Sequence, residues 1–154
     1  MEQAFNWCDK YTVHKDKVIL TQEQLHIPGL RMLGHHTSYS ATSSLSWHYH
    51  KSAFEFSLPV QGTFSFANKE ERFSFSGGEV FVSFPDEIHG TDQRPVTVGE
   101  LYWFQLDISR EKDLLFLSPE ASQALVKQLL ALPRHVVKTD IKKTLPLLEK
   151  AFSL

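Results

Sequence analysis

Short segments that alternate apolar and polar side chains are the feature that most constrains the fold of this chain. They cover residues 45–50, 54–58, 63–66, 72–75, 79–84 and 96–107. Turn-forming residues separate them, as in Ser76-Gly77-Gly78 and Pro85-Asp86. A period of two is typical of strands that bury one face, and short strands at this spacing favour an antiparallel sandwich or barrel. The sequence therefore predicts an all-β core within residues 1–108.

The pattern changes to a helical one after residue 108. Ser118 followed by Pro119 is typical of a helix start, and Pro133 would end that helix. A second helix is expected from Asp140, and Pro146 either kinks it or lies in its first turn if it starts later, near residue 144. The apolar positions are Leu125, Leu129 and Leu132 in the first helix, and Ile141, Leu145, Leu148 and Phe152 in the second. Residues 109–154 are thus expected to form two amphipathic helices.

The last eight residues, 147–154, remain amphipathic and contain no glycine, asparagine or proline that would stop a helix. This favours a piece of a longer protein over a natural terminus that frays.

Charge and cysteine content exclude several functions. Sixteen Lys and Arg against eighteen Asp and Glu give a net charge of −2, without a basic run, so this chain alone is not expected to bind nucleic acid. Cys8 is the only cysteine and can form no intramolecular disulfide, which fits a reducing cytosol. Neither a signal-peptide pattern nor an apolar run long enough to span a membrane is present. The prediction is a cytoplasmic protein without a membrane partner.

Three histidines and one glutamate have the spacing of a metal site. His48 and His50 are two residues apart, so on a strand both imidazoles face the same side. Glu55 follows on the face opposite the phenylalanines at 54 and 56, and His89 comes later in the chain. Three imidazoles and a carboxylate form a complete set of protein ligands for a divalent metal. The expected metal is Zn, Ni, Fe or Mn.

This spacing resembles the first motif of the cupin superfamily, which reads G-x5-H-x-H-x3,4-E-x6-G. His48, His50, Glu55 and Gly62 match it in type and position, and Thr42 stands where the motif has its leading glycine. The resemblance implies a small double-stranded β-barrel of the jelly-roll type.

The second cupin motif, G-x5-P-x-G-x2-H-x3-N, is matched less closely. Gly78 and His89 have the expected separation, while Pro85 lies one place late. Asp86 replaces the inner glycine and Gln93 replaces the asparagine. All positions that hold the metal in the family are nevertheless retained.

The order of the segments resembles one cupin subfamily more specifically: the N-terminal effector-binding and dimerisation domain of AraC-type transcriptional regulators. That resemblance covers roughly residues 30–152 and includes the strand 102–106. It implies a ligand-sensing barrel over 1–108, a helical dimerisation segment over 109–154, and a helix-turn-helix domain beyond the chain end. It also implies a homodimer that contacts DNA only through that further domain. A protein of this kind is a regulator and not an enzyme.

The resemblance also implies a small-molecule effector bound in the barrel. By the period of two, Trp103 and Gln105 share a face, and both are predicted to contact this ligand together with His48, His50, Glu55 and His89. A tryptophan beside polar groups suits a sugar or another small polar molecule, although simple core packing of Trp103 is equally compatible with the pattern. Nucleophilic catalysis is not indicated, and no catalytic residue is predicted. The alternative is a stand-alone metal-dependent cupin enzyme, of dioxygenase or isomerase type.

Overall fold

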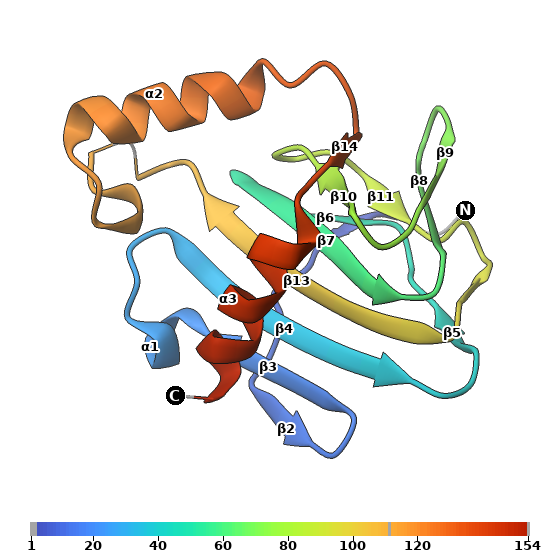
Figure 1. Cartoon of the computed structure of the whole chain (residues 1–154). Coiled ribbons are helices and arrows are strands. Elements are labelled where there is room, and N and C mark those ends of the chain that lie inside the picture. Colours follow the sequence, from blue (N-terminus) through green and yellow to red (C-terminus); the bar gives the residue numbers. More distant parts are fainter. Residues whose placement is uncertain (1–2, 111, 154) are drawn as a thin grey trace.

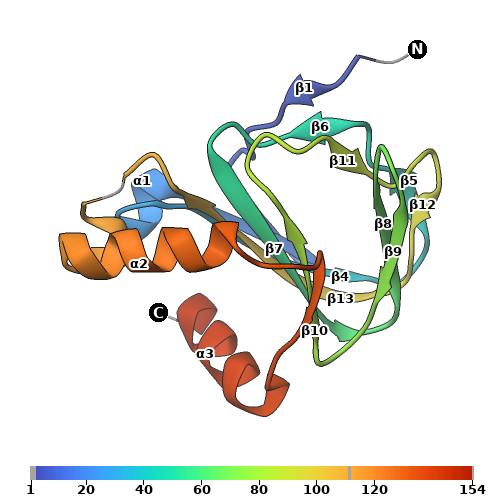
Figure 2. The same cartoon turned by 90° about the horizontal axis from the view of Figure 1, so that it is seen from above.

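Two β-sheets face each other and form a barrel, as seen end-on in Figure 2. The computed structural model describes residues 3–110 and 112–153. The larger sheet has the order β14 (Val136–Lys138), β10 (Glu79–Ser83), β7 (Ala53–Gln61), β13 (Gly99–Asp107), β4 (Leu30–Ser38), β3 (Lys17–Thr21) and β2 (Thr12–His14). The smaller sheet has the order β1 (Phe5–Asn6), β6 (His48–Tyr49), β11 (His89–Gly90), β8 (Phe64–Asn68) and β9 (Arg72–Phe75). β5 (Thr42–Ser44) pairs with β12 (Pro95–Val96).

Every alternating segment predicted from the sequence contains a strand, but the first strands of the larger sheet were not predicted. In β4, Met32 and Gly34 on one face are as buried as Leu33 on the other. A strand covered on both faces lacks the alternation that reveals a half-exposed one. The N-terminal part of the barrel therefore has no clear period-two signal.

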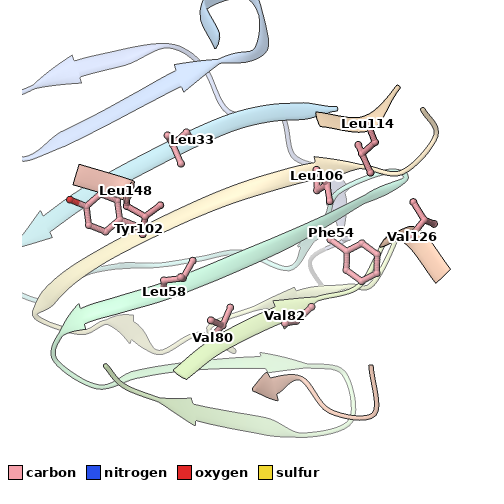
Figure 3. Close-up of a cluster of buried hydrophobic side chains, with 10 residues drawn as sticks. All are labelled: Leu33, Phe54, Leu58, Val80, Val82, Tyr102, Leu106, Leu114, Val126 and Leu148. Atoms are coloured by element: carbon pink, nitrogen blue, oxygen red, sulfur yellow. The ribbon is translucent and has the colours of Figure 1, made fainter. Parts of the chain in front are cut away.

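The main hydrophobic core lies outside the barrel, between the larger sheet and the C-terminal helices (Figure 3). Phe54 and Leu58 project from β7 and Tyr102 and Leu106 from β13 toward this side. The remaining buried members are Leu33, Val80, Val82, Leu114, Val126 and Leu148. The outward face of the central strands is thus apolar, which leaves the inward face free to carry polar groups.

A second, aromatic cluster fills one part of the barrel interior. Phe64, Phe66, Phe75 and Phe81 are buried together, with ring centroids between 5.3 and 6.1 Å apart in the contacting pairs. These rings close off the region of β8, β9 and β10, so that the remaining interior is available for a site.

Both predicted helices are present, and both cover the outer face of the larger sheet (Figures 1 and 2). α2 (Pro119–Leu130) begins as expected: the Ser118 side chain accepts a hydrogen bond from the Ala121 amide at 3.2 Å. α3 (Ile141–Ser153) begins at Ile141 and runs through Pro146, so a start near residue 144 is wrong. Between the helices, β14 joins the edge of the larger sheet. A short helix, α1 (Gln22–Leu25), and a 3-10 turn, Leu114–Phe116, complete the helical elements described. None of the described helices is long and apolar enough to cross a bilayer.

The turns explain one departure from the cupin motif. Gly62 and Gly78, which match motif glycines, both have φ of +88°. Asp86 stands where the motif has another glycine and also has a positive φ, of 63°. Aspartate tolerates this left-handed region better than most residues. Its carboxylate also accepts a hydrogen bond from the Ser52 amide at 3.1 Å, which ties the turn after β10 to the turn before β7.

Candidate metal centre

Four side chains from three strands meet inside the barrel. His48 lies on β6, His50 directly after it, Glu55 on β7 and His89 on β11. Each offers one ligand atom, and these atoms all lie within 4.8 Å of one another. The three imidazoles are no more than 4% exposed. The ligand set predicted from the sequence is therefore brought together.

Hydrogen bonds fix the orientation of all three imidazole rings. The Nδ1 atoms of His48, His50 and His89 lie 2.6, 3.2 and 2.9 Å from the backbone carbonyl oxygens of Ser46, Trp7 and Glu87. A carbonyl oxygen only accepts hydrogen bonds, so Nδ1 of His48 and of His89 carries the proton, whereas Nδ1 of His50 lies 3.2 Å both from the Trp7 carbonyl and from the donating Gln105 amide nitrogen. The Nε2 atoms of His48 and His89 are thereby left with their lone pairs, as a metal requires.

The Nε2 atoms themselves point to a missing partner. Those of His50 and His89 are buried and make no well-aligned hydrogen bond within the described part of the chain, although the Glu55 carboxylate oxygens lie 2.9 and 3.6 Å from them. Buried polar atoms are normally paired, and an unpaired one calls for an explanation such as an ion. A divalent metal at this point would bind both atoms, so the residues fit the group.

The charges of the site also favour a cation. Burial alone would raise the pKa of the Glu55 carboxyl, but His50 and His89 outweigh burial and hold this pKa well below its usual range. Burial, reinforced by the charge of His89, lowers the pKa of His48 to about 4. For His50, burial is outweighed by Glu55, whose carboxylate oxygen lies 2.9 Å from Nε2, and the pKa is raised. At neutral pH the site thus holds a carboxylate and a neutral His48, both ready to bind metal.

The cross-strand neighbours of Glu55 form hydrogen bonds with the metal-facing residues on the side away from the cavity. Gln105 on β13 and Ser83 on β10 are its register partners. The Gln105 amide donates to Glu55 Oε2 at 2.8 Å and to Asp9 Oδ2 at 3.2 Å. The Ser83 hydroxyl lies 2.8 Å from His89 Nδ1. Gln105, expected at the ligand, is instead buried behind Glu55 and is absent from the described residues that line the cavity. Its amide is occupied by the two carboxylates, which explains this placement.

A cavity of about 500 Å³ opens in front of the metal-facing residues. Its wall includes His48, His50, Glu55 and Trp103, whereas His89, also expected at the ligand, is not among the described lining residues. Trp103 lies flat against β4, because Gly34 opposite it has no Cβ: one built there would be 2.3 Å from the indole.

The N-terminal segment supplies cavity residues that the sequence did not reveal. Trp7 follows β1, which pairs with β6, and its ring centroid lies 4.9 Å from that of His48. Asp9 and Lys17 also line the cavity, as does His36, which shares the inward face of β4 with Gly34. No motif marks Trp7, Asp9 or Lys17. Alternation along β4 would have placed His36 inward once the strand was recognised.

Comparison with known proteins adds similarity of fold. No family model and no curated protein matches the chain. Among solved structures, a predicted oxalate decarboxylase from Thermotoga maritima is 19% identical, with a TM-score of 0.47, over 58% of this chain and 79% of its own. A cupin protein from Bacteroides fragilis is 16% identical, with a TM-score of 0.49, over 64% of this chain and 83% of its own.

A further solved structure, of Bacillus subtilis oxalate decarboxylase studied for its Mn(II) centres, is 12% identical with a TM-score of 0.45. It covers 86% of this chain and 44% of its own. Each of these likenesses concerns the fold alone. The predicted β-barrel followed by two helices is confirmed by the strand order and the helices of this chain, and the four metal-facing residues rest on their own geometry.

Proposed function

We propose that this protein is a metal-dependent enzyme of the cupin type that acts on a small polar molecule in the barrel. The observation that carries the proposal is the convergence of three imidazole nitrogens and one carboxylate beside an open cavity. Each ring is held by a contact between its Nδ1 atom and a backbone carbonyl oxygen. Catalytic metal sites combine such a protein ligand set with positions left open for substrate.

The bound metal would act as a Lewis acid on a substrate oxygen. The chain's own residues supply the rest of the chemistry. Trp7 and Trp103 wall the cavity, and Phe66 of the buried aromatic cluster adds an apolar surface to its lining. Asp9 also lines the cavity, and burial, reinforced by the charge of Glu55, raises the pKa of its carboxyl to about 6. A carboxyl with such a pKa can take up or release a proton near neutral pH, the property required of a general acid or base.

The first test is metal content together with metal-dependent turnover. Tag-free protein is loaded with Mn, Fe, Ni or Zn, dialysed, and analysed by mass spectrometry of the elements. One metal per chain is expected for the wild type and for His14→Ala, whose side chain is exposed, while His48→Ala is expected to retain almost none. Conversion of a metabolite mixture is then followed by NMR and by oxygen uptake. Turnover that persists after metal removal, or in metal-free His48→Ala, would contradict the proposal.

A ligand-sensing domain of an AraC-type regulator is the second candidate. What favours it is the helical face outside the barrel, where Leu130 of α2 and Leu147 of α3 are 54% and 69% exposed. Such residues suit a contact with a second copy, and DNA binding would reside in a domain outside this sequence. Sedimentation of the wild type and of Leu147→Glu tests this. A dimer that the variant abolishes, together with ligand binding without turnover, would favour the sensor over the enzyme.

A further inference from the structure

One cationic side chain shares the cavity with the metal-facing residues. Lys17 projects from β3 and lines the cavity together with Asp9 and His36. Its Nζ lies 6.0 Å from the centroid of the Trp103 ring. Within the described residues, this ammonium group forms no ion pair shorter than 4.0 Å. A lysine at a cavity wall without a close carboxylate is a group that a ligand anion can pair with.

The net charge of the metal-loaded cavity would be positive, like that of Lys17. A divalent metal would contribute two positive charges, and Glu55 would cancel one of them. Lys17 adds one positive charge and Asp9 at most one negative charge, and imidazoles bound to the metal are neutral. The loaded cavity is therefore net positive by one charge or more, which disfavours cationic ligands and favours anions.

The other walls suit a hydroxylated carbon skeleton. Trp7 and Trp103 present indole surfaces, on which the C–H face of a polyol or sugar ring can stack. Thr42, Ser43 and Ser44 of β5 add hydroxyl groups to the lining. The volume of about 500 Å³ lies within the range of cavities that hold one small molecule.

We propose that the cavity selects a small hydroxylated carboxylate, such as a sugar acid, whose carboxylate group pairs with Lys17. The inference names the substrate class of the enzyme proposed above and so rests on that function. It makes Lys17 a specificity-determining residue, and it predicts that the uncharged sugar of the same shape binds poorly.

Glucuronate and glucose are the probes, because they differ only in a carboxylate in place of a hydroxymethyl group. Binding to metal-loaded protein is measured by calorimetry, and the indole NMR signals report on contact with the cavity walls. Glucuronate is expected to bind at least about tenfold more tightly than glucose, as one charge-assisted pair provides. This preference should weaken as sodium chloride is raised.

The matched variants are Lys17→Met and Lys15→Met. Lys15 is exposed, lies two residues away and is absent from the described cavity lining. Lys17→Met should abolish the preference for glucuronate, and Lys15→Met should retain it. Lys17→Arg preserves the charge and should retain most of the preference, which keeps the test valid if the methionine variant does not fold.

Each outcome decides the proposal. Equal binding of the two probes, binding of neither, or a preference that survives Lys17→Met would overturn it. The metal content of every sample is measured in parallel. Loaded protein without a carboxylate preference refutes only the substrate class, whereas protein that cannot be loaded refutes the metal-dependent function as well.

Discussion

The contact between Gly34 and Trp103 provides the sharpest test of the cavity wall. In Gly34→Ala the new Cβ would lie 2.3 to 2.7 Å from three atoms of the Trp103 ring system. To remove this overlap, the distance between the new Cβ and the nearest Trp103 ring atom must grow from 2.3 Å to at least 3.4 Å. The indole must therefore move by about 1.1 Å. Gly34 is buried between β3 and β13, which leaves the strand itself little room to retreat.

Overpacking of this kind costs about 1–3 kcal/mol. The change from glycine to alanine recovers about 0.4–1 kcal/mol by restricting the unfolded chain. We therefore expect Gly34→Ala to lower the free energy of unfolding by about 1–2 kcal/mol. Because Trp103 lines the cavity, ligand affinity should fall as well.

Urea unfolding measures the first effect, and the indole NMR signal of Trp103, assigned with Trp103→Phe, measures the second. Gly77→Ala is the control, because a Cβ there meets nothing closer than 3.4 Å and should change stability by less than about 0.5 kcal/mol. If Gly34→Ala is as stable as the wild type and the Trp103 signal does not move, the indole does not rest on β4 and the reasoning fails.

Three further predictions concern the metal centre and its surroundings. Metal at a thousandfold excess over its dissociation constant should raise the free energy of unfolding by about 4 kcal/mol in urea titrations. A chelator should remove this gain. An equal gain in His48→Ala would argue against the site. Gln105→Leu removes the amide that donates a hydrogen bond to Glu55. Metal affinity, measured in competition with a chelator dye, should weaken by about 10–100-fold. Unchanged affinity would mean that Gln105 does not position Glu55. In metal-free protein the pKa of Asp9 is about 6, above the 3.8 of the unfolded chain, so this carboxyl lowers stability progressively as the pH rises from 3.8 to about 6. Asp9→Asn should therefore gain as much as about 3 kcal/mol at about pH 8 and less at about pH 5, and a gain independent of pH would contradict the buried carboxyl.

Features that depend on residues close together in the chain were predictable without the structure. The period of two places His48 and His50 on one side and turns Phe54 away from Glu55, because successive side chains of a strand point to opposite faces. The helix start at Ser118 was likewise predictable from one hydroxyl group and the proline that follows it.

The distant residues that complete the site are brought there by the pairing of strands far apart in the chain. His89 reaches His48 because β11 pairs with β6, and Gln105 meets Glu55 because β13 lies in one particular register beside β7. Lys17 enters the cavity only because β3 continues the larger sheet beyond β4. Strand register arises from packing between residues far apart in sequence, and local periodicity, which identifies a strand and its faces, carries no information about which strand will lie beside it.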